Sequence, residues 1–118
     1  MPEYVVMFPA DNEVEREAGT EADRQATFDT DYEFGQLLEA RGGAVTGGAG
    51  LTHSRKARTI KRGAKSNVLV SDGPFTESAE QLSGFFIVTC DDYDSLVDAA
   101  RILTRAHPVV EIRPVAEF

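Results

Sequence analysis

The 118 residues are enough for one domain and too few for two, and a net charge of −8 argues against nucleic acid as a main partner. The longest apolar runs, residues 4–8 and 85–88, fall well short of the ~20 residues that cross a bilayer. No basic stretch precedes the first run, and the single cysteine, Cys90, can form no internal disulfide. We therefore expect one cytoplasmic domain, residues 1–118, without a membrane partner.

The first third of the chain predicts a strand, a loop and a helix. Residues 4–8 are β-branched and aromatic up to Pro9, which is typical of a strand, here a central one. Residues 11–19 are acidic and weakly apolar and predict a mobile loop. Thr20 followed by Asp23 resembles a capping pair, so we expect a helix from there to the glycine pair at 42–43.

One side of this helix is predicted to be buried, because several apolar residues gather there at 100° per residue. They are Phe28, Tyr32, Phe34, Gly35 and Leu38. Asp31 falls inside the same arc. Because burying a lone carboxylate is costly, Asp31 must be solvated, paired or functional.

The rest of the chain predicts five more strands and a second helix. Three glycines in residues 44–51 weaken a strand and indicate a bulge. Residues 57–62 and 67–71 predict a hairpin around Gly63. Residues 84–90 are typical of a strand that is covered on both faces. Asp91 or Asp92 is expected to cap the second helix, and residues 109–115 to form the last strand.

This order of elements predicts an α+β, ferredoxin-like sheet with two helices on one face and an added β-hairpin. Two helices can cover only one face of the sheet. The other face would stay apolar and exposed to water unless a second subunit covers it. We therefore expect a homodimer.

The hairpin leads into Asp72-Gly73-Pro74-Phe75 and then Thr76-Glu77-Ser78-Ala79-Glu80-Gln81-Leu82-Ser83-Gly84-Phe85. This segment resembles the signature of the DGPF branch of the YCII-related family, Asp-Gly-Pro-Phe-x-Glu-x-Lys-Glu-x-Leu-x-Gly-Phe/Tyr. Only Ala79, in place of the usual lysine, departs from it. The resemblance implies a dimeric α+β barrel, in which two such sheets pack face to face. It does not imply a reaction, because most of the family has none established.

Asp72 is the leading candidate for a functional residue. An aspartate before a glycine is ordinary turn chemistry, in which the carboxylate accepts bonds from nearby backbone amides. The resemblance places this aspartate at the edge of a pocket, where it would act as a general base or as the partner of a base. The two roles are compatible.

The two histidines are the natural proton carriers near neutral pH. His53 departs from the Leu-x-Pro-Ser pattern that the DGPF branch often has there, so a surface role and a pocket role both stay open. His107 precedes Pro108 at the end of the second helix, where a capping role suffices. The wider family is proposed to pair a histidine with an aspartate after its first strand, and the matching helix here offers Asp31 and no histidine.

Residues 41–71 hold seven basic residues and no acid. Such a stretch is typical of a solvated basic hairpin, and it would also suit the wall of a cleft that attracts anions. Nucleic acid is disfavoured, because no aromatic residue interleaves with these cations. Two histidines 54 positions apart and one cysteine offer no zinc spacing, and no phosphate-binding loop is present, so we expect no metal and no cofactor.

The sequence is compatible with two functions. One is an isomerase- or lyase-like enzyme that moves a proton on a small cyclic or carbonyl compound. Its acid and base candidates are Asp72, His53 and Asp31, and Arg58, Arg62 and Phe75 would bind an anionic or cyclic ligand. The other is a non-catalytic ligand-binding or regulatory module. The resemblance suggests this second role, because DGPF proteins are often encoded beside, or fused to, alternative sigma factors.

Overall fold

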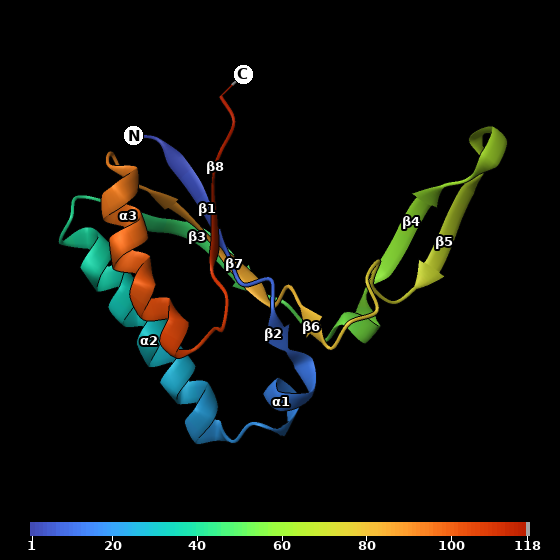
Figure 1. The fold of residues 1–118 in the computed structure, drawn as a ribbon, viewed down its shortest axis with the longest axis horizontal. Coiled ribbons are helices and arrows are strands. Elements are labelled where there is room, and N and C mark those ends of the chain that lie inside the picture. Colours follow the sequence, from blue (N-terminus) through green and yellow to red (C-terminus); the bar gives the residue numbers. More distant parts are fainter. Residues whose placement is uncertain (118) are drawn as a thin grey trace.

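The computed structural model describes residues 1–117 as an antiparallel sheet with helices on one side and a projecting hairpin on the other (Figure 1). The sheet has the order β3-β7-β1-β8. Its strands are β1 (Glu3–Met7), β3 (Ala44–Gly50), β7 (Gly84–Thr89) and β8 (Glu111–Pro114). This order confirms the predicted ferredoxin-like α+β fold. Over the described residues the sheet stays open and forms no closed barrel.

Helices α2 (Glu21–Glu39) and α3 (Tyr93–Ala100) cover one face of the sheet. The predicted capping pair of α2 is confirmed: the Thr20 hydroxyl accepts from the Asp23 amide, and the Asp23 carboxylate accepts from the Thr20 amide. Asp92 caps α3 and accepts from the Asp94 amide. None of the helices in residues 1–117 combines the length and the apolar character needed to cross a membrane.

The core lies between these helices and the sheet. It is built from alternate residues of β1 and β7 and from one face of each helix, as the periods of strand and helix require. Its buried side chains are Tyr4, Val6, Phe8, Phe34, Leu38, Val88, Cys90, Leu96, Ala99, Ala100 and Leu103.

Only the C-terminal half of α2 reaches this core. Phe34 and Leu38 are fully buried, whereas Phe28 and Tyr32 are 65% and 70% exposed. A helix of 19 residues is about 28 Å long, and a strand of five residues such as β1 spans about 17 Å. The N-terminal half of α2 therefore extends past the sheet. The predicted buried face is wrong at Phe28, which lies beyond the sheet, and at Tyr32, which stays exposed beside Val45 at the edge strand β3.

The segment predicted as a mobile loop is ordered, so that prediction is wrong. Residues Asp11–Asn12 form β2, which pairs with β6 (Glu80–Gln81), and Glu13–Ala18 form the short helix α1. Asn12 caps α1 by accepting from the Glu15 amide. The local composition gives little sign of a helix here, and Glu13, its first residue, is buried by contacts with a distant part of the chain.

The strand β7 was predicted to be covered on both faces, and within the single chain it is covered on one. Val88 points into the core, while Phe85 and Ile87 lie on the opposite face. The register places them beside Met7 and Val5 of β1. These four half-buried apolar residues define what we call the open face.

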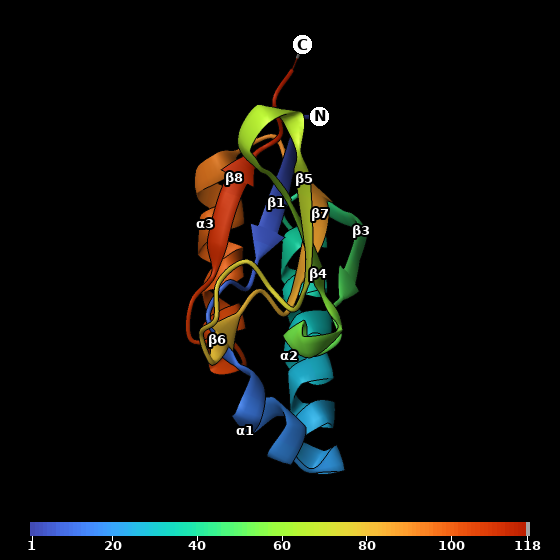
Figure 2. The ribbon, with the colours of Figure 1, turned by 90° about the vertical axis from the view of Figure 1, so that its right-hand side faces the viewer.

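The predicted hairpin is confirmed as β4 (Arg58–Arg62) and β5 (Val68–Asp72). We call residues 58–72 the arm. It projects from the side of the open face, opposite to α2 and α3, as two perpendicular views show (Figures 1 and 2). A tight turn, Ala64–Ser66, reverses the chain at its tip.

The two halves of α2 predict a matched pair of variants. Phe34→Ala should lower the free energy of unfolding by about 3–5 kcal/mol, because it removes a fully buried ring. Phe28→Ala, six residues earlier on the same helix, should change it by about 0.5 kcal/mol or less. Urea denaturation followed by far-UV circular dichroism measures both. Equal losses would show that the N-terminal half of α2 is packed.

Candidate functional site

An open cleft of about 1060 Å³ lies under the overhanging half of α2, between α1, β3 and the start of β7. Small-molecule sites commonly have volumes of about 300–1,000 Å³, so the cleft is large enough for a metabolite. Aromatic side chains form part of its wall, namely Phe8, Phe28, Phe85 and Phe86. Ionisable side chains form much of the rest.

A buried histidine between two carboxylates stands at the inner wall of this cleft. The Nδ1 atom of His107 lies 2.9 Å from Oδ2 of Asp11, and its Nε2 atom lies 3.3 Å from Oδ1 of Asp31. Ser83 donates its hydroxyl to the same Asp11 oxygen at 2.5 Å. His107, Asp11 and Ser83 are buried, and the Asp31 side chain keeps 22% of its surface exposed. We call these four residues the carboxylate–histidine cluster.

The register of the sheet brings this cluster together. Met7, the last residue of β1, pairs with Phe85 near the start of β7 and with Glu111 at the start of β8. The segment that follows β1 and the segments that precede β7 and β8 therefore meet at one end of the sheet, where these strands begin or stop. They carry Asp11, Ser83 and His107, and the overhang of α2 adds Asp31 from above.

The His107 ring is fixed on its face as well as at its edges. It stacks on Phe8 with ring centroids 3.7 Å apart and the two planes 11° from parallel. A charged imidazolium over an aromatic face is stabilised by the ring quadrupole. His107 thus has one orientation, set by Phe8, Asp11 and Asp31 together.

The charges of the cluster favour a protonated His107. Burial lowers the pKa of His107, but the hydrogen bonds and charges of Asp11 and Asp31 outweigh it and raise the pKa to about 9. Burial likewise tends to raise the pKa of Asp11, while the hydrogen bonds from His107 and Ser83 hold it below its usual value. At neutral pH the imidazolium therefore donates to both carboxylates.

Asp11 has one further acceptor. Its Oδ1 atom is buried and finds no hydrogen-bond donor in residues 1–117. A buried carboxylate oxygen without a partner is costly. Asp11 lines the cleft, but this oxygen is itself buried and is not open to a molecule bound there.

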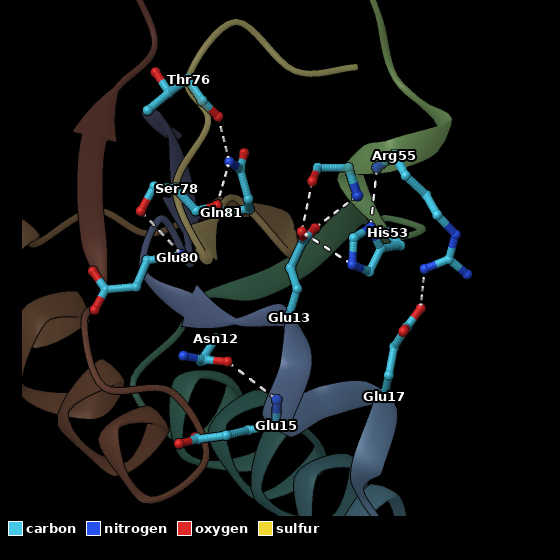
Figure 3. Close-up of polar contacts among 11 residues, drawn as sticks. Asn12, Glu13, Glu15, Glu17, His53, Arg55, Thr76, Ser78, Glu80 and Gln81 are labelled. Atoms are coloured by element: carbon cyan, nitrogen blue, oxygen red, sulfur yellow. Dashed lines mark hydrogen bonds and ion pairs between the residues drawn. The ribbon is translucent and has the colours of Figure 1, made fainter. Parts of the chain in front are cut away.

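A second polar cluster lies on the outer wall of the cleft (Figure 3). Ser54 donates its amide and its hydroxyl to Glu13, at 2.7 and 2.6 Å. His53 places Nε2 3.4 Å from the same carboxylate, and its Nδ1 accepts from the Arg55 amide. Burial tends to raise the pKa of Glu13, but the Ser54 bonds and the His53 charge lower it. The Ser54 hydroxyl donates to the Glu13 carboxylate and not to a histidine. These bonds tie the turn Ser54–Lys56 to α1.

The structure brings some of the predicted site residues to the cleft and leaves others apart. Asp31 and His53 line it. The cleft lining does not include Asp72, Arg58, Arg62 or Phe75, which lie on the arm or just beyond it. The Asp72 side chain is 94% exposed and has Arg58 3.9 Å away. The assignment of these four residues to catalysis or ligand binding stays a prediction.

The central residue of the site, His107, has no local signature in the sequence. His107 was expected to cap α3, and it is instead held by two carboxylates that are 96 and 76 positions away. No local pattern reports such a contact. The strand order of a ferredoxin-like sheet could have revealed it, because that order places the residues before the last strand beside those after the first.

Other chemistries find little support in residues 1–117. No group of three or more histidine, cysteine, aspartate or glutamate side chains in that range is arranged to hold a metal ion. Cys90 is buried in the core.

Comparison with known proteins places the chain in a family without giving it an activity. Residues 3–118 match the family described as YCII-related domain. The chain is 33% identical over 118 residues to an uncharacterized protein of Rhizobium meliloti (strain 1021). That similarity covers 98% of this chain and 93% of the relative.

The cluster predicts a loss of stability at alkaline pH. The folded-state pKa of His107 is about 9, above the unfolded value of about 6.5. Its contribution is fully present below about pH 6.5 and is lost as the pH rises through 9. Because the ring borders an open cleft, solvent screens part of the effect, and we expect a loss of about 2 kcal/mol. Urea denaturation between pH 6 and 10 measures it.

His107→Gln is the control for this dependence. The variant should be less stable at pH 6 and should lack the decline between pH 6.5 and 9, because the titrating group is gone. A wild-type stability that is flat over this range, or a decline that persists in His107→Gln, would contradict the ion pairing of His107.

Proposed function

The chain belongs to the YCII-related family, and we propose that it is an enzyme that moves a proton on a small molecule bound in the cleft. The observation that carries this proposal is a histidine buried between two carboxylates on the wall of a cleft of metabolite size. Perturbed ionisable groups of this kind gather at catalytic sites, because acid–base chemistry needs them.

Each of the three ionisable residues, Asp31, His107 and Asp11, has a different role in the proposed reaction. His107 is already protonated at neutral pH, so it cannot act as the base. Asp31 takes that role, since it is the cluster's more exposed carboxylate and its Oδ2 atom has no hydrogen-bond partner in residues 1–117. His107 orients Asp31 through Oδ1 and keeps a positive charge beside the reacting atoms. Asp11 holds His107 and is a positioning residue.

The reaction class follows from a single base of this kind. A carbon next to a carbonyl group gives its proton to Asp31, and the charge that develops is stabilised by the nearby imidazolium. If the proton returns to a different atom of the same molecule, the reaction is an isomerisation. If a neighbouring group leaves with the electron pair, the reaction is an elimination.

The charge of the cleft narrows the ligand class. Its lining carries two arginines, Arg16 and Arg24, and seven carboxylates. The carboxylates are Asp11, Glu13, Glu15, Glu17, Asp23, Asp31 and Glu80. Such a surface disfavours a strongly anionic ligand. A neutral cyclic or carbonyl compound suits it better, since the aromatic wall can pack on its ring.

Hydrogen–deuterium exchange on carbon tests the proposed chemistry without a known substrate. A panel of small lactones, cyclic ketones and 2-oxo acids is incubated with the protein in D₂O, and loss of the proton next to the carbonyl is followed by ¹H NMR. We expect at least one compound to exchange faster than in buffer. Asp31→Asn should slow that exchange by about 100-fold or more, since an amide cannot accept the proton.

Asp72→Asn is the matched control, because it makes the same change at an exposed carboxylate outside the cleft. It should retain the wild-type rate, and a loss there would restore Asp72 as the catalytic carboxylate. Compounds that shift the amide resonances of cleft residues in ¹⁵N spectra but exchange no proton would contradict the enzyme and favour the ligand-binding module. Exchange that is equal in Asp31→Asn and wild type would also reject Asp31 as the base.

A further inference from the structure

We propose that Phe28 is the platform of the cleft, meaning the aromatic face on which the ring of a ligand stacks, and that it selects flat cyclic carbonyl compounds. This inference deepens the proposed function, and it rests on that function for the role of Asp31. The ring of the ligand lies on Phe28, and the carbon that loses its proton lies beside Asp31.

One face of α2 borders the cleft. The cleft lining includes five residues of this helix: Asp23, Arg24, Thr27, Phe28 and Asp31. From Arg24 onward they are spaced three or four positions apart, as residues on a single helix face are. The polar members near Phe28 are engaged close by, since Thr27 donates to the Asp23 carbonyl and Arg24 donates to the Gly19 carbonyl. Phe28 is the apolar member of this face.

The Phe28 ring is exposed at a place where a ligand can cover it. Its side chain is 65% exposed and does not belong to the buried core of residues 1–117. A single aromatic residue on a surface needs no explanation by itself. Phe28 differs because it lines the same cleft as the carboxylate–histidine cluster. A ligand that covers this ring removes apolar area from water, which favours binding.

The spacing of Phe28 and Asp31 joins the platform to the proposed base. Residues three positions apart on a helix have Cβ atoms about 5–6 Å from each other. Helical side chains lean toward the N-terminus, so the Asp31 carboxylate leans toward the turn that carries Phe28. Its Oδ1 atom lies 3.3 Å from Nε2 of His107, which leaves Oδ2 for the ligand. A ring stacked on Phe28 therefore has its edge within reach of Asp31.

The strand side of the cleft suits a flat ligand. Strand β3 contributes Gly47, Gly48, Ala49 and Gly50 to the lining, so this part of the wall is backbone with one methyl group. A Cβ at Gly50 would meet no atom of residues 1–117 within 4 Å, its chain neighbours aside, so the space beside it is open. Aromatic rings stack with offset faces, and a planar ring contacts such a face more closely than a puckered one.

The binding of 2-indanone tests the platform without reference to turnover. This neutral ketone has a five-membered ring fused to a flat benzene ring, and cyclopentanone is the same ketone ring without the fusion. Dissociation constants come from titrations followed in ¹⁵N spectra of the protein. Wild type should bind 2-indanone about tenfold more tightly, because the fused ring adds a face that stacks. Equal affinities, or no binding of 2-indanone, would overturn the proposal.

Substitutions at Phe28 and Tyr32 test which residue carries this preference. Both are exposed aromatic residues of α2, but the cleft lining includes Phe28 and not Tyr32. Phe28→Leu keeps an apolar side chain without a flat face, so it should weaken 2-indanone binding about tenfold and cyclopentanone binding less than about threefold. Phe28→Trp keeps a flat face and should bind 2-indanone as wild type does.

Tyr32→Leu is the matched control and should also bind 2-indanone as wild type does. Because both positions are exposed, circular dichroism should show that all three variants fold. Equal losses in Phe28→Leu and Tyr32→Leu would reject Phe28 as the platform.

Proton exchange on carbon separates this proposal from the proposed reaction. In D₂O, Asp31→Asn should still bind 2-indanone but should not accelerate exchange next to its carbonyl, since an amide cannot accept the proton. If wild type binds 2-indanone through Phe28 and exchanges no proton, the platform is confirmed and the proposed reaction is wrong. If Phe28→Leu binds 2-indanone as tightly as wild type, the platform is wrong, even where exchange depends on Asp31.

Discussion

The one interaction on which the site depends is the burial of His107 between Asp11 and Asp31. These residues come from segments 76 and 96 positions from the histidine, and they join β2, the middle of α2 and the connection before β8. A charge removed from water is tolerated only with such partners. Loss of either carboxylate would leave a buried cation half-compensated, so the cluster specifies how the helical layer sits on the sheet as well as what the cleft can do.

The cleft itself follows from a mismatch of lengths. The helix α2 is much longer than the strands beneath it, so its N-terminal half has no sheet to pack on. The short helix α1 and the glycine-rich strand β3 border the resulting space without filling it. Gly48 has a φ of +139°, and a Cβ there would approach the Phe85 carbonyl to 2.3 Å, so a side chain at this point of the wall is excluded. The chain thus forms its cleft by leaving part of a helix unpacked, and that same overhang delivers Asp31 to His107.

Local signals predicted most of the fold, and contacts between distant segments decided the rest. The capping box at Thr20, the glycine bulge in β3 and the alternating hairpin strands are short-range features, and each was predicted correctly. Phe28 was predicted to be in the core because helical periodicity shows which residues share a face of the helix. Periodicity does not show whether the sheet packs against that face. Residues 11–19 were predicted to form a loop from their local composition. That prediction is wrong because the contact that holds α1 comes from the distant Ser54. The capping role predicted for His107 is wrong for the same reason, because its partners become neighbours only after the sheet has formed.

The segment that carries the family resemblance begins apart from the cluster, although Ser83 near its end belongs to the cluster. Asp72-Gly73-Pro74-Phe75 stands where β5 ends, and Gly73 has a φ of +96°, a left-handed conformation that suits glycine. The Gly73 amide closes the base of the arm on Ala57, and the Gly73 carbonyl accepts from the Thr59 hydroxyl at 2.8 Å. The backbone role of this tetrapeptide is therefore to terminate the arm and return the chain to the sheet. This tetrapeptide therefore reports on the arm, whereas Asp31, His107 and Asp11, to which we assign the proposed acid–base chemistry, lie outside it.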